Sequence, residues 1–485
     1  MCTNKTNYGL FDCLHNYNLD HVKVEIFMCL DYKSLHLARQ VSKGWRDFID
    51  KEIWSARRSH ALGLIAEEWR NNEPTQRIIE CPSRVRDLTV DDKILLAESF
   101  LKILVLAPSS GKSIDVIQGL STKIRGSWDT VHGNRDISSR IIAMGIGHGS
   151  VPGQMVIWDR STLKLLCSVH LPGNEEYLTN DEYRTVEYVR CVKTVGDFVV
   201  AGGFDGTLTA FSIRSILAQE APNQNIINDF EGSPLEIGFW KFTDLFPIED
   251  TVTIKMDEKI CFLEKDGTWL LVLSNNEGAL WDFSSAPNLR TKIEGISGRV
   301  SGRVTDCALK YPYAFFATRC KWEVMGESSG HKIVEIWDID KNYQIRKIQI
   351  VDPGTGTLCI TVNRNFLASK IRGGSHRQQP KSSIFIHDIE ELVNKNLSND
   401  ALWMKKLEYP VFDDVSGMIV TSFYIAINSS SLFAISGYGC KEGHKRIYIW
   451  DFVNNKNDFD SVGGSVKCVE KESFLKRLKN WTRKK

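Results

Sequence analysis

The chain lacks several of the features from which a function could be assigned directly. Its 12 cysteines include no C-x-x-C pair, and no H-E-x-x-H sequence occurs. Scattered cysteines are typical of reduced, mostly buried thiols, so we expect neither a disulfide framework nor a metal site. No apolar run approaches the roughly 20 residues that a membrane-spanning helix requires. The opening residues are polar and form no apolar signal core, so we expect a cytoplasmic or nuclear protein.

An excess of charge of one sign is also missing. The 61 lysines and arginines nearly balance the 60 aspartates and glutamates, which leaves a formal net charge of +1. This balance argues against a protein that binds nucleic acid or a membrane surface over much of its area. We therefore expect no nucleic-acid partner and no membrane partner. We also expect no cofactor.

A recurring strand pattern is the main feature that is present. Short apolar, mostly β-branched runs end in Trp-Asp at Trp158, Trp281, Trp337 and Trp450. Three weaker copies keep the strand pattern without the dipeptide. A tandem unit of this kind indicates a repeat architecture. Taken as the third strand of each unit, the seven copies are Ile114–Ile117, Met155–Asp159, Leu208–Ser212, Ala279–Phe283, Val334–Ile339, Ile384–Ile389 and Ile447–Phe452.

These repeats resemble those of WD-repeat β-propellers. The resemblance implies a mainly β fold in which residues 75–470 form a seven-bladed propeller of four-stranded antiparallel blades. The four tryptophans are then expected to pack within the blades. Either Thr75–Cys81 or Ser465–Glu470 could supply the outer strand of the last blade. We favour the amino-terminal strand, because it would join the two ends of the ring.

A helical segment precedes the repeats. Residues 22–46 read V-x-V-x-I-F-x-x-L-D-x-x-S-L-x-x-A-x-x-V-S-x-x-W-R, and Ile53-Trp54 closes the pattern. This sequence resembles an F-box, so residues 18–58 are expected to form a small all-α F-box domain. Such a domain buries little apolar surface by itself and normally has a partner. The resemblance implies binding to the Skp adaptor, and through it to cullin, by Val22, Val24, Ile26, Phe27, Leu30, Leu35, Val41 and Trp45. The alternative is a helical cap on the propeller.

Two further segments flank the propeller. Residues 59–74 predict a helical linker that ends near the Asn-Asn-Glu-Pro sequence. Residues 471–485 predict a basic amphipathic tail. We expect this tail to pack on the propeller or to fray.

Basic residues concentrate where the second and third strands of several blades connect. Blades three and four have short hairpin signals there, whereas Gly145–Gln154, Arg319–Lys332, Lys370–Ser383 and Gly437–Arg446 read as long insertions. Polar loops on a rigid scaffold commonly carry recognition, and arginine pairs well with carboxylate or phosphate. We therefore predict a face that binds an acidic or phosphorylated target. The predicted residues of this face are Arg319, Lys321, Arg372, Arg377, Lys381, Lys445 and Arg446. The alternative is a set of solvated loops that only keep the protein soluble.

No catalytic motif is supported. The sequence from Ala107 to Ser113 resembles a P-loop, but Leu106 stands where a glycine is required and a strand follows in place of a helix. The combined resemblance implies a non-catalytic receptor: the substrate-recognition subunit of a Skp–cullin–F-box ubiquitin ligase. The alternative is a WD-repeat scaffold for protein interactions with no role in ubiquitination.

Overall fold

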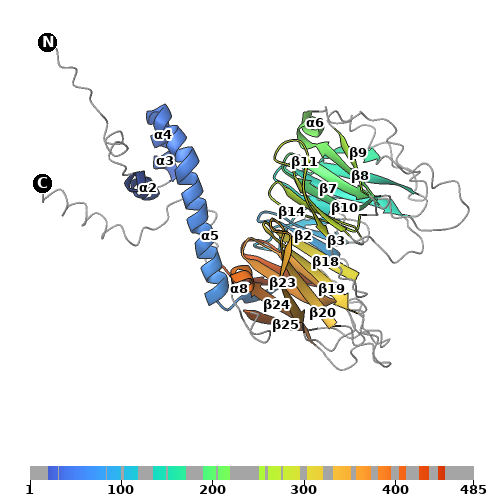
Figure 1. Cartoon of the computed structure of the whole chain (residues 1–485). Coiled ribbons are helices and arrows are strands. Elements are labelled where there is room, and N and C mark those ends of the chain that lie inside the picture. The colour runs from blue at the N-terminus through green and yellow to red at the C-terminus, as the bar shows by residue number, and fades with distance from the viewer. Residues whose placement is uncertain are drawn as a thin grey trace, which may run out of the picture. The chain divides into compact units, whose positions relative to one another are not determined.

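Among the described residues, helices occupy the first part of the chain and strands most of the remainder (Figure 1). This computed structural model describes residues 20–30, 32–82, 85–99, 103–117, 135–148, 151–170, 189–203, 206–218, 251–256, 260–274, 277–294, 296, 303–320, 331–350, 357–372, 381–394, 404–410, 425–435 and 446–453. The chain divides into two units: Met1–Thr75 with Asp451–Lys485, and Gln76–Trp450. No helix within these described ranges is long and apolar enough to cross a membrane.

The first unit is helical. Its elements are α2 (Asp20–Met28), α3 (Tyr32–Val41), α4 (Lys43–Phe48), the π-helical turn η1 (Ile49–Ile53) and α5 (Trp54–Asn71). Ser42 separates α3 from α4, and its hydroxyl accepts a hydrogen bond from the backbone N–H of Trp45 at 3.1 Å. A serine at this position satisfies a backbone donor that the first helical turn would otherwise leave unpaired. At its other end α5 places Trp69 in a stack on Phe452, with ring centroids 3.8 Å apart.

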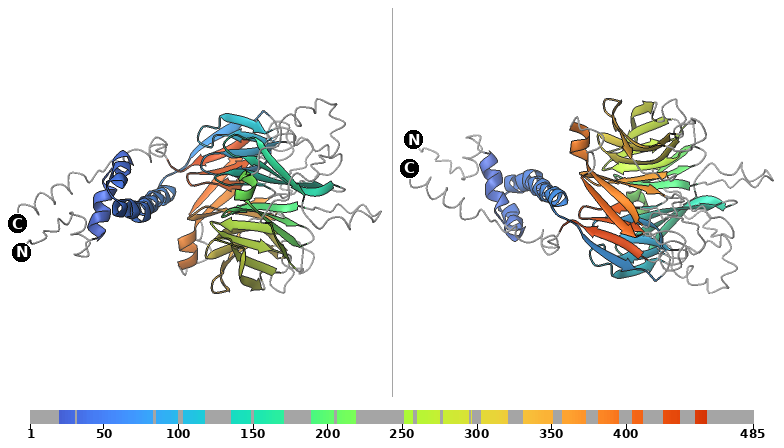
Figure 2. Two further views of the ribbon diagram at one scale, coloured as in Figure 1. Left: turned by 90° about the horizontal axis from the view of Figure 1, so that it is seen from above. Right: turned by 90° about the horizontal axis from the view of Figure 1, so that it is seen from below.

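The second unit contains seven four-stranded sheets, which lie side by side (Figure 2). In chain order the first three blades are β2 (Val85–Val90) to β5 (Ser113–Ile117), β6 (Arg135–Ile137) to β9 (Leu165–His170), and β10 (Val189–Val195) to β13 (Val252–Lys255). The next three are β14 (Phe262–Asp266) to β17 (Asn288–Glu294), β18 (Arg303–Lys310) to β21 (Tyr343–Ile350), and β22 (Thr357–Val362) to β25 (Lys405–Pro410). Blade seven is β26 (Ile425–Ile427), β27 (Ser431–Ile435), β28 (Arg446–Asp451) and β1 (Thr75–Glu80).

The strands between these bounds complete each blade. They are β3 (Leu95–Ser99) and β4 (Ile103–Leu106); β7 (Ile141–His148) and β8 (Val151–Asp159); β11 (Phe198–Gly203) and β12 (Thr207–Ser212); β15 (Trp269–Leu273) and β16 (Glu277–Asp282); β19 (Tyr313–Cys320) and β20 (His331–Asp338); and β23 (Phe366–Arg372) and β24 (Lys381–Asp388). Short helices α6 (Ile213–Ala218) and α8 (Ile389–Asn394) follow the third strands of blades three and six. Their buried isoleucine and leucine side chains join the apolar clusters of the ring.

The blades form a closed ring. The first strand of each blade contacts the first strand of the next, and β26 of blade seven contacts β2 of blade one. These first strands are therefore the innermost ones. The outer strand of blade seven is β1, which pairs with β28 and brings the amino-terminal strand to the end of the ring. A mainly β, seven-bladed propeller after a helical segment is thus confirmed, and the amino-terminal strand makes the closure.

The Trp-Asp dipeptides have a structural role. Trp158, Trp337 and Trp450 are each at least nine-tenths buried at the end of a third strand. The following aspartate often caps the next turn: Oδ1 of Asp159 accepts from the backbone N–H of Thr162 at 2.7 Å, and Oδ1 of Asp338 accepts from that of Lys341 at 3.1 Å. An aromatic residue followed by an acceptor for turn N–H groups therefore suits the end of the third strand in these blades.

Blade one corrects part of the sequence prediction. Ile114–Ile117 was expected to be its third strand, but β5, which contains it, is the fourth and outermost strand. The third strand is β4, whose four residues are all buried. The segment between them is a hairpin turn, in which Gly111 has a φ of +70° and donates its N–H to the carbonyl of Ala107 at 2.7 Å. The sequence that resembles a P-loop is therefore a turn between strands.

Parts of the predicted insertions are also strand. Gly145 pairs with Met155 and Ile146 with Gln154, so blade two extends its central hairpin through residues expected to form a loop. Arg319 likewise pairs with Lys332, and Lys370 with Ile384. Because the two strands on either side of each connection continue to pair, their backbone N–H and C=O groups bond each other, whereas a loop would leave them to water. Residues 321–330, 373–380 and 436–445 lie outside the described residues.

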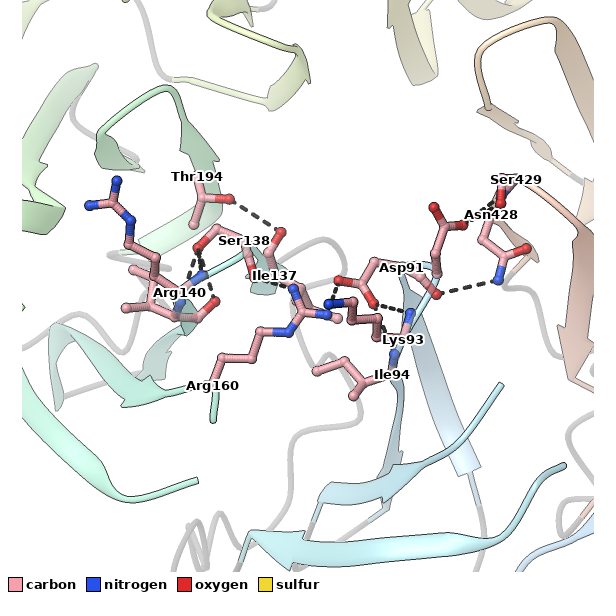
Figure 3. Close-up of polar contacts among 12 residues, drawn as sticks. Asp91, Lys93, Ile94, Ile137, Ser138, Arg140, Arg160, Thr194, Asn428 and Ser429 are labelled. Atoms are coloured by element: carbon pink, nitrogen blue, oxygen red, sulfur yellow. Dashed lines mark hydrogen bonds and ion pairs between the residues drawn. The ribbon is translucent and has the colours of Figure 1, made fainter. Parts of the chain in front are cut away.

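We call the end of each blade where its second and third strands connect the loop end, and the opposite end the turn end. Polar contacts cross from blade to blade at the turn end (Figure 3). The amide of Asn428 in blade seven donates to the carbonyl of Asp91 in blade one at 3.3 Å. Arg160 of blade two lies between the carbonyl of Ser138 and the carboxylate of Asp91. Further along, Arg140 and Asp197 pair at 3.2 Å between blades two and three. These contacts help hold neighbouring blades in register.

Charged groups on the inner strands add a second set of contacts. Arg135 is buried and pairs with Asp87 at 2.6 Å and Glu98 at 2.7 Å, which joins blade two to blade one. Asp136 bonds Lys265 and also accepts from the backbone N–H of Thr194 at 2.7 Å. Burial opposes the ionisation of Asp136, but Lys265 and Lys193 outweigh it and hold its pKa below the usual value.

Candidate functional site

The helical unit has a small apolar core. Phe27, Leu35, Ala38, Ile49 and Ile53 are its buried members, and Trp45, Phe48 and Trp54 are among the half-buried residues that pack against them. The rings of Phe27 and Trp45 meet edge to face with centroids 5.3 Å apart. Aromatic pairs of this geometry add to the stabilisation from burial. The core therefore holds α2, α3 and α4 together.

The outer side of α3 carries two exposed apolar side chains. Leu37 exposes 59% of its surface and Val41 exposes 65%. They are four residues apart and so lie on one face of the helix. Leu35 and Ala38 point to the opposite side and are buried. A small unit gains no stability from leaving such groups in water, so this face is a candidate partner-binding surface.

An ion pair holds α3 against η1. Nη2 of Arg39 lies 2.7 Å from Oδ2 of Asp50, and both side chains are partly exposed. The backbone carbonyl of Arg39 also accepts a hydrogen bond from Nε of Arg46 in α4 at 3.5 Å. Arg39 lies between Leu37 and Val41 in sequence. These contacts therefore limit rotation of α3 about its own axis.

The eight residues predicted to bind the adaptor fall into three groups. Phe27 and Leu35 are fully buried, and Val41 is exposed. Val22, Val24, Ile26, Leu30 and Trp45 are half-buried. Leu37 was not among the predicted residues, although it lies on the exposed face with Val41. Leu37 could have been found from the sequence, because apolar residues occur on both sides of α3 and not on one face alone.

The predicted basic face is described only in part. Arg319 and Arg372 lie in the last two residues of second strands, while Lys381 and Arg446 begin third strands, so the backbones of all four are at the loop ends of their blades. Lys321, Arg377 and Lys445 are outside the described residues. The side chain of Arg446 pairs with Glu80 of β1 at 3.3 Å, across the strands that close blade seven.

No group of three or more potential metal ligands occurs in the described part of the chain. Cys81, Cys167 and Cys307 are buried thiols that form no disulfide. Burial raises the pKa of Cys81 to about 11 and that of Cys167 to about 12, which disfavours the reactive thiolate. These thiols therefore have the properties of packing residues.

Comparison with known proteins agrees with the helical geometry. Residues 20–58 match the family model described as F-box-like. The search of curated proteins returned no match. A chain in "Crystal Structure of Mitotic Checkpoint Complex" is 13% identical, with 79% of this chain and 92% of that chain covered at a TM-score of 0.44. A computationally designed protein, Ika8, is 11% identical, with coverage of 78% and 100% and a TM-score of 0.40.

Proposed function

Residues 20–58 form an F-box-like segment followed by a seven-bladed β-propeller, and from this arrangement we propose that the chain is the substrate-recognition subunit of a Skp–cullin–F-box ubiquitin ligase. The observation that carries the proposal is the pair of exposed apolar side chains, Leu37 and Val41, within the matched segment. In this function the helical unit binds the Skp adaptor, and the adaptor connects the chain to cullin. The chain performs no bond chemistry of its own.

The packing of the helical unit supports a docking role. Its core residues are buried around Phe27, and the Arg39–Asp50 pair steadies α3 at 2.7 Å. A preformed surface loses less conformational freedom on binding than a loose one. Leu37 and Val41 would then bury their exposed area against the adaptor.

The propeller is the proposed receptor for the target protein. Blade-to-blade contacts such as Arg160–Asp91 and Arg135–Glu98 favour a rigid ring. The basic loop-end positions, among them Arg319 and Arg372, suit an acidic or phosphorylated target segment. Holding such a target beside the ubiquitin-loaded enzyme raises its effective concentration, which is how a non-catalytic subunit accelerates the transfer.

The adaptor contact is tested with a double substitution, Leu37→Asp with Val41→Asp, in the full chain co-expressed with a Skp adaptor and cullin. We expect co-purification of both partners to be lost, because two carboxylates would have to be desolvated in an apolar contact. Leu64→Asp is the matched control, since Leu64 is 48% exposed on α5 and lies outside the matched segment. Equal recovery of the adaptor with all variants would favour a WD-repeat scaffold without a ligase role.

The target face is tested separately. Reversing Arg372 and Arg377 to glutamate should reduce recovery of ubiquitinated targets while adaptor recovery stays unchanged. An unchanged set of targets would show that these positions are ordinary solvated residues.

A further inference from the structure

The turn end of blade five carries an aromatic and acidic surface that the proposed function does not use. We call it the blade-five surface and define it by Trp269, Tyr311, Asp340 and Tyr343. Tyr343 begins β21 directly opposite Asp338, the last residue of β20. The turn between them reverses tightly, with Asn342 at a φ of +50°. Asp340 and Tyr343 are therefore placed by a short connection between two paired strands.

The aromatic part of this surface is rigid. Trp269 of β15 and Tyr311, which follows β18, stack with ring centroids 4.2 Å apart and planes 8° from parallel. Both residues are partly buried against the apolar cluster between blades four and five. Tyr343, at the start of β21, exposes 47% of its surface. Tyrosine and tryptophan bring large contact area with few rotatable bonds, which is why they dominate the energetics of many interfaces.

The acidic part has carboxylates without a cation. Both oxygens of Asp340 accept from the hydroxyl of Tyr311, at 2.7 and 2.8 Å, so its partner is neutral. Oδ1 of Asp282 accepts from the backbone N–H of Ser284 at 2.8 Å. The neighbouring carboxylates are neutralised: Asp266 pairs with Lys310 at 2.7 Å and Asp338 with Lys341 at 2.9 Å.

One further cation is close. Arg290 of β17 is exposed and acts on the phenol of Tyr311 electrostatically, in opposition to Asp282 and Asp340. Of the charged groups that act on the phenol of Tyr311, Asp340 and Asp282 are negative and Arg290 is positive, so these three sum to one negative charge. An incoming positive charge would therefore be favoured there over a negative one.

We propose that the blade-five surface binds an arginine-bearing peptide segment of a protein partner. A guanidinium is planar, stacks on aromatic rings and donates paired hydrogen bonds to a carboxylate. Tyr343 offers a ring that already attracts a cation, since Nζ of Lys341 lies 5.9 Å from its centroid, and Asp340 has the neutral hydroxyl of Tyr311 as its partner. This surface lies at the turn end, opposite to the basic positions at the loop end. The two ends of the ring thus select segments of opposite charge, and this inference does not depend on the adaptor contact.

The test uses the full chain and two fluorescein-labelled peptides, one alternating glycine with arginine and the other alternating glycine with citrulline. Citrulline keeps the shape of arginine without its charge, so we expect only the arginine peptide to raise fluorescence anisotropy. Asp340→Asn should weaken binding about tenfold, since the amide removes the charge and still accepts from Tyr311. Tyr343→Ala should weaken it several-fold, and Tyr343→Phe, which keeps the ring, should not.

Two variants make the result specific. Asp115→Asn removes an exposed carboxylate of blade one and should leave binding unchanged. Arg290→Ala removes the competing cation and should tighten binding. Equal binding of the citrulline peptide would overturn the proposal, and so would unchanged affinity of Asp340→Asn. Tighter binding of an acidic peptide of alternating glycine and glutamate would overturn it as well.

Discussion

Arg160 and Asp91 connect the first two blades, with Nη2 of Arg160 lying 2.6 Å from Oδ2 of Asp91. The same guanidinium donates to the backbone carbonyl of Ser138 in its own blade at 2.7 Å (Figure 3). One side chain therefore satisfies a carboxylate and a carbonyl that belong to different sheets. It is 13% exposed, so water screens the pair only weakly.

We predict that Arg160→Ala lowers the free energy of unfolding of the propeller by about 1 to 3 kcal/mol, because Asp91 loses its cation and the carbonyl of Ser138 loses its donor. Arg140→Ala is the control. Its pair with Asp197 crosses the next junction, but both side chains are about half exposed, so the expected loss is below about 0.5 kcal/mol. Denaturant titration of the full chain measures both. Equal losses would mean that burial does not set the strength of these contacts.

Arg135 should be more important. Its side chain is 2% exposed and compensates both Asp87 and Glu98. Arg135→Ala would leave two carboxylates near the ring interior without a cation, which we expect to cost about 3 to 5 kcal/mol. Thermal unfolding followed by circular dichroism should show this loss, whereas Lys93→Ala at the exposed turn of blade one should unfold like the parent chain. A stable Arg135→Ala protein would contradict the assigned role.

Asp306 predicts a pH dependence. Burial is the main cause that raises its pKa from 3.8 to about 7, aided by nearby Glu264 and opposed by Lys193 and by hydrogen bonds from the backbone N–H groups of Ile360 and Cys307. Between these pH values the folded chain holds a proton that the unfolded chain has released. Its stabilising contribution is therefore complete below about pH 4 and is lost as the pH rises to about 7.

Asp306→Asn cannot titrate but retains an oxygen that can accept from Ile360. We expect this variant to gain stability relative to the parent as the pH rises from about 4 to about 7, by on the order of 3 kcal/mol. Parallel denaturant titrations across that pH range provide the measurement. A constant difference between variant and parent would show that Asp306 does not bind its proton more tightly in the folded state.

The helical unit allows core and surface roles to be separated. Phe27→Ala should destabilise it by about 3 to 5 kcal/mol, because the ring is buried against Trp45 and Phe48. Leu37→Ala should leave its helical signal unchanged and weaken only adaptor binding. Circular dichroism and adaptor pull-down on the same samples distinguish the two effects. Loss of binding without loss of structure in Phe27→Ala would place Phe27 in the contact itself.

The sequence predicted the third strand correctly in blades two to seven, where an aromatic residue or histidine stands at or near its end. Blade one was misplaced because β4 has neither, while the alternation in Ser113–Ile117 resembles a third strand. An outer strand and a third strand can show the same spacing of apolar residues in the sequence. Only the pairing of β4 with both β3 and β5 distinguishes them.

The candidate site was predicted less completely. Helical spacing identified Leu35 and Val41 together, but it could not say that Leu35 faces the core and Val41 the solvent. That distinction depends on which side of α3 meets Phe27 and Ile53. No pattern in the sequence pointed to a binding surface at Asp340 and Tyr343, because this surface forms only when blades four and five pack side by side.

The closure of blade seven has a consequence for how the protein is made. Glu80 of β1 and its partner Arg446 of β28 are 366 positions apart in the chain. A ribosome therefore releases β1 early, and the strand must wait for nearly all of the remaining chain before it can pair. An unpaired strand edge is prone to aggregation during that interval. Messenger RNAs that are truncated before β28 should yield chains with an open seventh blade. Cellular quality control would recognise these chains by their exposed apolar surface.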